Sequence, residues 1–259
     1  LGDFPFDEYE EMAFTEKMYL FFEDYFDHLD PAPDYRVFMR VLETPPYGGG
    51  TALSNSFMLS RGPVDRGARE DDMRTVFVHE LLHQWTGSVE GGSIDENWFS
   101  EGLTTYYELT LPFKAGETSL DDYVAGLNWL SRNFYTNQAR DWSIAEIKKV
   151  GFNNGDIRHV PYYRGALYFA DLDVFAARES GEIVLDADTW RELVSEATGV
   201  DESAFHKAVH VTGKSFFPAD DAFGDCVTGT RTSVEIDGET FETIEWAPVV
   251  GADLSVCRG

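Results

Sequence analysis

The chain has 259 residues and a formal net charge of −27, with 47 acidic residues against 20 basic ones. A surface of this sign repels nucleic acid and anionic membranes, so we expect neither as a partner. The excess of negative charge favours cationic partners or is typical of a protein from a salt-adapted organism. Hydrophobic residues make up 43% of the chain, enough for a core, yet no apolar run reaches transmembrane length.

Features at the two ends of the chain indicate whether the protein is exported. The acidic N-terminus, which starts at Leu1, does not resemble a signal peptide and is typical of a trimmed precursor or a fragment. Cys226 and Cys257 are the only cysteines. A bridge between them would close about 32 residues and stabilise the fold by roughly 3–4 kcal/mol. A bridge predicts an exported protein, periplasmic or secreted; two reduced thiols are the alternative.

The first sixty residues predict one helix and two strands. Aromatic residues recur at helical spacing over 6–28, which predicts a helix that packs on the core. Residues 35–42 alternate as a strand does, and 51–59 read as a second strand after a proline- and glycine-rich turn. A polar loop over 61–69 follows.

An H-E-x-x-H signature at 79–83 organises the rest of the chain. On a helix, His79 and His83 leave the same face and can bind one metal ion. Glu80 can reach a water on that metal and act as general base without being a ligand. This pattern predicts a catalytic zinc site.

The signature lies in a run from 73 to 85 that contains no glycine or proline, which favours a helix. We expect Asp71 and Asp72 to cap its start and Gly87 to end it. A glycine-containing loop over 88–94 then leads to a second helix, with Asp95 as its N-cap.

A catalytic zinc ion takes three protein ligands and leaves one position for water. Glu101 is the favoured third ligand, because the 17 residues after His83 leave room for a loop and a returning helix. Glu96 and Glu90 are weaker candidates. Glu108, on the same helix face as Glu101, is a candidate for orienting a ligand histidine.

Downstream elements are mostly helical. A helix is expected after Ser119, a loop over 136–160 and a buried helix over 161–180. Two short helices follow at 188–198 and 203–210. In the tail, an Asp-Gly pair between two alternating segments predicts a β-hairpin.

The segments HELLHQW at 79–85 and WFSEGLTTYY at 98–107 resemble the gluzincin metallopeptidases. They are most similar to the glycyl aminopeptidase family and more distantly to the alanyl-type aminopeptidases. PYYRGAL at 161–167 is similar to the tyrosine-bearing helix start of that family. The resemblance runs from about Tyr35 to Asp225. It implies a zinc-dependent peptidase with one Zn²⁺ per chain.

The resemblance also implies the fold. We expect an α+β, mainly helical chain with a thermolysin-like (gluzincin) catalytic domain over 1–225. That domain would hold a small β subdomain at about 35–60 edging the cleft, zinc helices at about 72–110 and a helical lobe at about 119–215. A β-hairpin appendage would occupy 226–259. Relatives carry an N-terminal β-rich domain and often a PDZ-like module, and neither is evident in this sequence.

In the resembled families the second strand pairs with an extended peptide, and a glutamate after its glycines holds the free α-amine of the substrate. Gly49, Gly50, Thr51 and Ala52 occupy that stretch here, with Ala52 in place of the glutamate. A methyl group cannot pair with an ammonium. The glycines are alternatively a plain flexible turn.

A tyrosine at the start of the helix over 161–180 donates a hydrogen bond to the oxyanion in similar enzymes. Tyr162 is assigned that role, with Tyr163 as the rival and simple packing as the alternative. His159 lies close enough in sequence to Tyr162 to reach substrate. His206 and His210 are also four apart, but no glutamate follows His206, so we interpret them as packing or surface residues.

The residues predict hydrolysis by a metal-activated water, and the resemblance implies that the substrate is a peptide and that the activity is aminopeptidase-like. Because Ala52 removes the amine anchor, an endopeptidase-like hydrolase is the first alternative. A binding protein that keeps zinc for structure is the second, and Glu80 argues against it because a structural site has no use for a general base.

Overall fold

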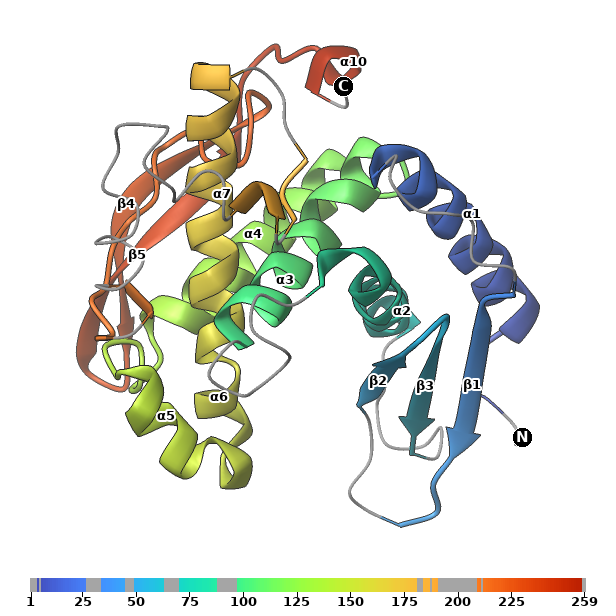
Figure 1. Cartoon of the computed structure of the whole chain (residues 1–259). Coiled ribbons are helices and arrows are strands. Elements are labelled where there is room, and N and C mark those ends of the chain that lie inside the picture. Colours follow the sequence, from blue (N-terminus) through green and yellow to red (C-terminus); the bar gives the residue numbers. More distant parts are fainter. Residues whose placement is uncertain are drawn as a thin grey trace. The chain divides into compact units, whose positions relative to one another are not determined.

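The computed structural model describes residues 4, 6–26, 34–44, 49–62, 70–87, 97–180, 184–186, 188–190, 209–210 and 212–257. The chain divides into two compact units, Leu1–Gly87 and Ser88–Gly259, and each is described by itself. Helices predominate and two small sheets accompany them, which agrees with the α+β class (Figure 1). Within the described residues, no helix has the length and apolar character needed to span a membrane.

In the first unit, a three-stranded sheet has the order β1-β3-β2. Strand β1 (Arg36–Val41) pairs in parallel with β3 (Ser56–Arg61), and β2 (Gly50–Leu53) pairs antiparallel with β3. The single strand expected over 51–59 is therefore wrong. The segment is two strands joined by a tight turn, because Asn55 adopts a left-handed conformation with φ 53°.

Two helices complete this unit. Helix α1 (Glu8–Phe26) buries a stripe at helical spacing, and α2 (Glu70–Thr86) packs against it through Trp85. The ring of Trp85 stacks on Phe26 at 5.8 Å and meets Phe22 edge-on at 5.8 Å. On the sheet side, the rings of Phe57 and Phe77 lie 5.4 Å apart. Helix α2 is thus held by aromatic contacts to both α1 and the sheet.

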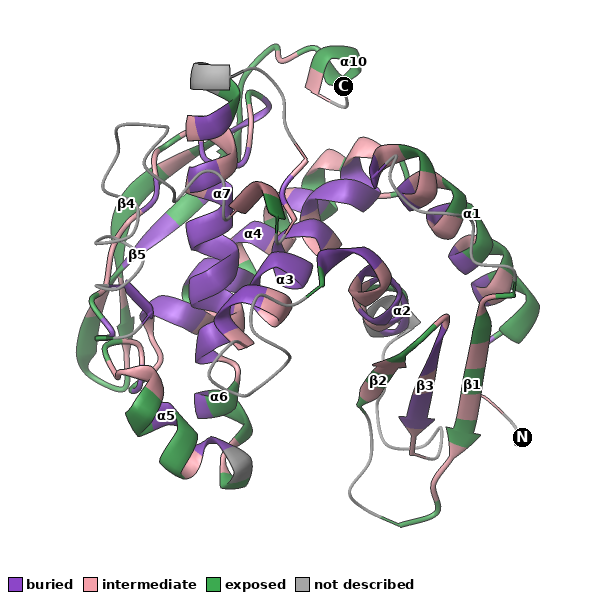
Figure 2. Cartoon of the chain, in the orientation of Figure 1, coloured by how far each residue is buried: buried purple, intermediate pink, exposed green. Residues whose placement is uncertain are grey.

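The second unit is built on two long helices, α3 (Asn97–Lys114) and α7 (Val160–Ser180). Both are buried over most of their described lengths (Figure 2). Helix α4 (Leu120–Tyr135) also packs in this unit and starts as expected, with the Ser119 side chain accepting a hydrogen bond from the Asp122 amide. Burial of these apolar faces is the main stabilising term of the unit.

The loop expected over 136–160 is wrong. That segment contains α5 (Ile144–Val150), a 3-10 turn η3 (Gly151–Asn153) and α6 (Gly155–Arg158). Ser143 and Glu146 form a reciprocal capping box that starts α5, and the Asn154 side chain caps α6. These caps stabilise helices too short to show a clear apolar period.

The predicted C-terminal hairpin is confirmed and is longer than expected. Strands β4 (Val227–Ile236) and β5 (Glu239–Pro248) join through Asp237 and Gly238, both at positive φ. The buried Trp246 fixes the hairpin to α4, since its indole N–H donates to the Ser131 hydroxyl at 2.8 Å. The amide of Asn128 pairs with the Trp246 backbone at 2.8 and 2.9 Å.

The bridge predicted between Cys226 and Cys257 is present, and it ties the start of β4 to the short helix α10 (Leu254–Cys257). Two predicted helices, 188–198 and 203–210, fall largely outside the described residues. Only 188–190 and 209–210 are described there, and both are helical.

Candidate metal centre

Helix α2 presents the H-E-x-x-H residues as the sequence predicts. The imidazole rings of His79 and His83 lie 4.9 Å apart, centroid to centroid, and both side chains are half-buried. On the other face, Phe77 and Leu81 are fully buried. Packing of the apolar face therefore leaves the two imidazoles together on the opposite side.

The start of α2 differs from the sequence expectation. The helix already begins at Glu70, so Asp71 and Asp72 lie in its first turn and are not its caps. Its end is as expected, because Gly87 follows the last helical residue with φ 64°. A glycine adopts this left-handed conformation without the strain that a Cβ would add.

Glu101 lies on α3, and it completes a group with the two histidines. His79, His83 and Glu101 each offer one ligand atom, and these three atoms all lie within 4.8 Å of one another. Of the three glutamates considered as the third ligand, Glu101 is the one that lies within the described residues. Glu90 and Glu96 lie outside the described residues.

This donor set fits zinc. Two imidazole nitrogens and one carboxylate oxygen form the ligand set of a catalytic zinc site with one position left for water. Bonds of about 2.0–2.2 Å in a tetrahedron place ligand atoms roughly 3.4 Å apart.

Glu80 is buried, with 7% of its surface exposed, and the sheet defines its position. A Cβ added at Gly50 of β2 would lie 2.2 Å from Oε1 of Glu80. The Glu80 carboxylate therefore lies directly against the backbone of β2, and a side chain at position 50 would have to displace it. The sequence pointed to Gly50 as a substrate-binding residue and gave no sign of this contact.

Tyr35 is a second neighbour of Glu80 that sequence reasoning missed. Burial raises the pKa of Tyr35 above its usual range, and the negative charge of Glu80 raises it further. The Tyr35 phenol is therefore neutral at any physiological pH. Tyr35 is therefore a polar but uncharged neighbour of the Glu80 carboxylate.

Gln84 joins helix α2 to the strands. Its side-chain oxygen accepts from the Asn55 backbone amide at 3.3 Å, and its amide donates to the Asn55 side chain at 3.2 Å. The pair fixes the turn between β2 and β3 on helix α2. Gly49, Gly50, Thr51 and Ala52 are thus positioned by the same helix that carries the histidines, and β2 lies at the edge of the sheet.

In the second unit, α3 and α7 contact each other at two glycines. A Cβ added at Gly165 would lie 2.1 Å from the carbonyl oxygen of Trp98 and 2.7 Å from the Gly102 Cα. This close approach fixes Glu101, which precedes Gly102, and Tyr162, which lies one turn before Gly165. The sequence contained both glycines, but their pairing is a long-range contact that no local pattern reveals.

The two candidate tyrosines differ in environment. Tyr162 is half-buried, whereas Tyr163 is only 9% exposed. Burial and then the charges of Glu108 and Asp156 raise the pKa of Tyr163 to about 12. His159 lies beside both rings, at 5.2 Å from Tyr162 and 6.1 Å from Tyr163. The greater exposure of Tyr162 makes it the better placed of the two to meet a ligand.

Glu108 is on α3 as predicted, and the structure places its charge near Tyr163. Its proposed orientation of a ligand histidine stays a prediction. His210 is fully buried, and its ring stacks on Trp98 at 4.1 Å and meets Tyr168 edge-on at 4.9 Å. The interpretation of His210 as a packing residue agrees with these contacts. His206 lies outside the described residues.

Arg164, next to the tyrosines, is a buried positioning residue. It is 1% exposed, and its guanidinium donates to the carbonyls of Arg140 and Trp142 at 2.8 and 2.9 Å. Burial lowers the pKa of Arg164 to about 10, an effect that the nearby charge of Asp141 opposes. The side chain anchors the 140–142 segment on the first turns of α7.

No family model matches the chain, and no curated protein matches it. Among solved structures, the chain is similar to the crystal structure of an aminopeptidase N family protein from Idiomarina loihiensis, with a TM-score of 0.63 and 17% sequence identity. The match covers 89% of this chain and 47% of that one, so the chain spans about half the length of its structural neighbour. At this identity the likeness establishes a shared fold.

Proposed function

We propose that this chain carries the catalytic residues of a zinc-dependent peptidase of the gluzincin type, acting in an aminopeptidase-like manner. The observation that carries the proposal is the grouping of His79, His83 and Glu101 as potential ligands. Glu80, on the same helix as the two histidines, supplies the carboxylate that hydrolysis requires. The fold shared with an aminopeptidase N family protein supports the same assignment.

His79, His83 and Glu101 would hold the ion. When bound, zinc supplies a Lewis acid that lowers the pKa of water and polarises the scissile carbonyl. Glu80 accepts the proton of the attacking water and delivers it to the leaving amine. Burial of Glu80 against the Gly50 backbone would restrict the movement of the carboxylate.

Two further parts of the chain would act on the substrate. Tyr162 would donate a hydrogen bond to the oxyanion, a contact that contributes roughly 3–4 kcal/mol in such sites. The edge strand β2 would pair with an extended peptide through its backbone. Glu108 would orient a ligand histidine.

The Cys226–Cys257 bridge supports export to an oxidising compartment, which we include in the proposal.

The critical test replaces Glu80 with Gln. We expect the variant to keep one zinc per chain, measured by atomic absorption, and to lose roughly 10²–10⁴-fold in hydrolysis of aminoacyl reporters. Glu16→Gln, an exposed position of α1, is the matched control and keeps full activity. His79→Ala is expected to lose the zinc. Substantial turnover by Glu80→Gln would refute the mechanism.

One observation favours an endopeptidase-like variant of this function. Ala52, the third residue of β2, offers a methyl group where an aminopeptidase needs a carboxylate for the free amine. Cleavage of one peptide with a free and with an acetylated N-terminus separates the two activities. If acetylation slows cleavage strongly, the aminopeptidase assignment holds; equal rates indicate an endopeptidase.

A further inference from the structure

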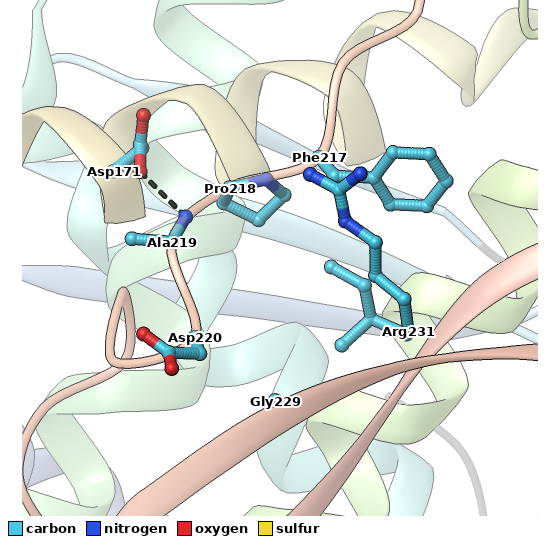
Figure 3. A pocket seen from close by; sticks show the side chains of 8 residues that line it. Asp171, Phe217, Pro218, Ala219, Asp220, Gly229 and Arg231 are labelled. Atoms are coloured by element: carbon cyan, nitrogen blue, oxygen red, sulfur yellow. Dashed lines mark hydrogen bonds between the residues drawn. The ribbon is translucent and has the colours of Figure 1, made fainter.

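The second unit contains a pocket of about 330 Å³ between α7, the 217–220 segment and the C-terminal hairpin (Figure 3). All of its lining residues belong to this unit, and none is among the proposed zinc, base or oxyanion residues. Its volume lies at the lower end of the range for small-molecule sites. The pocket therefore fits a small metabolite and not a folded partner.

The walls of the pocket are fixed by hydrogen bonds. The Asp171 carboxylate accepts from the Ala219 amide at 2.8 Å, and the Asp220 carbonyl accepts from the Gly229 amide at 2.7 Å. The hydroxyl of Tyr135 donates to the Phe216 carbonyl at 2.9 Å, just before the lining segment begins. A ligand would meet a pre-formed site and would not have to order it.

Charges of opposite sign line this pocket. The Arg231 guanidinium stands over the Phe217 ring at 4.5 Å, and Figure 3 shows the carboxylates of Asp171 and Asp220 nearer the Ala219 end. Within the described part of the chain, no carboxylate lies within ion-pair distance of the Arg231 guanidinium. The positive and negative groups thus line one cavity without neutralising each other directly.

This arrangement is complementary to a small zwitterion. The planar guanidinium of Arg231 can bind a carboxylate through two parallel hydrogen bonds, and the exposed carboxylate of Asp220 can bind an ammonium. Phe217 and Ile244 add apolar surface to the lining. We propose that this pocket is a binding site for a free α-amino acid with an apolar side chain, separate from the candidate metal centre. The proposal does not rest on the peptidase function.

Isothermal titration calorimetry of the whole chain with L-leucine tests the proposal. Chelator-treated protein is used so that a metal centre cannot contribute, and a His79→Ala sample is titrated beside it. We expect saturable binding that both treatments leave unchanged. N-Acetyl-L-leucine lacks the ammonium and 3-methylbutylamine lacks the carboxylate, so each is expected to bind at least about tenfold more weakly, the equivalent of one charge-assisted hydrogen bond.

Variants locate the binding. Arg231→Gln and Asp220→Asn are each expected to weaken L-leucine binding about tenfold. Ala219→Leu fills the cavity without changing its charge and is expected to abolish binding, which keeps the test valid if a charge variant unfolds. Arg132→Gln and Glu235→Gln remove exposed charges from α4 and β4 outside the lining and are expected to bind normally. Circular dichroism checks folding.

Three results would overturn the proposal. The first is no saturable binding of L-leucine at millimolar concentrations. The second is normal binding by folded Arg231→Gln and Ala219→Leu, which would place the ligand elsewhere. The third is equal binding of N-acetyl-L-leucine, which would make the pocket a simple anion site.

Discussion

Replacing Gly50 with Ala tests the contact between strand β2 and the proposed general base. The new Cβ would lie 2.2 Å from Oε1 of Glu80, where non-bonded heavy atoms prefer a separation of about 3.5 Å. The carboxylate must therefore move by about 1 Å. A displacement of about 1 Å in a catalytic group lowers the rate by roughly 10²-fold.

We expect Gly50→Ala to lower kcat/KM by about that factor in a zinc-loaded, chelator-sensitive assay with aminoacyl reporters. Zinc content is expected to stay at the wild-type level, because Gly50 is not a ligand. Gly155→Ala is the matched control, since a Cβ there meets no atom within 4 Å. Wild-type activity of a folded Gly50→Ala protein would contradict the inference that contact with β2 sets the catalytic position of Glu80.

Three more changes give separate outcomes. Tyr162→Phe is expected to lower kcat about 10²–10³-fold with little change in KM. Tyr163→Phe is expected to have little effect on turnover. If steady-state kinetics show the larger loss for Tyr163→Phe, the oxyanion role belongs to Tyr163. Gln84→Ala removes two partly buried hydrogen bonds to the β2–β3 turn, and urea denaturation is expected to show a loss of about 1–2 kcal/mol. Replacing both Cys226 and Cys257 with Ser removes a disulfide that spans a sequence separation of 31. We expect the free energy of unfolding to fall by about 3–4 kcal/mol. An unchanged value would mean that the disulfide does not stabilise the hairpin.

Helix α2 and its histidine pair were predictable because their signal is local. The i, i+4 spacing of His79 and His83 defines one helix face whatever packs behind it. The hairpin at 237–238 was predictable for a similar reason, since Asp237 and Gly238 tolerate the positive φ of a tight turn. The disulfide was expected because the chain has only two cysteines, and both lie in the same β-rich tail.

The misses occurred where local patterns carry little information. The turn at Asn55 lies in the polar stretch 54–56, which contains no glycine or proline, so two strands looked like one. Helices α5 and α6 are too short for a clear period, and their starts depend on the side chains of Ser143 and Asn154. The contacts of Gly50 with Glu80 and of Gly102 with Gly165 join segments far apart in the chain, and only the folded structure reveals them.

The central claim is that one zinc ion is bound by two imidazoles of α2 and one carboxylate of α3. Anomalous diffraction from zinc-soaked crystals, recorded on both sides of the zinc absorption edge, tests it most directly. We predict a single strong peak within bonding distance of His79, His83 and Glu101, with the remaining coordination position held by solvent and Glu80 beside it. A peak elsewhere, or a fourth protein ligand closing the site, would contradict the account.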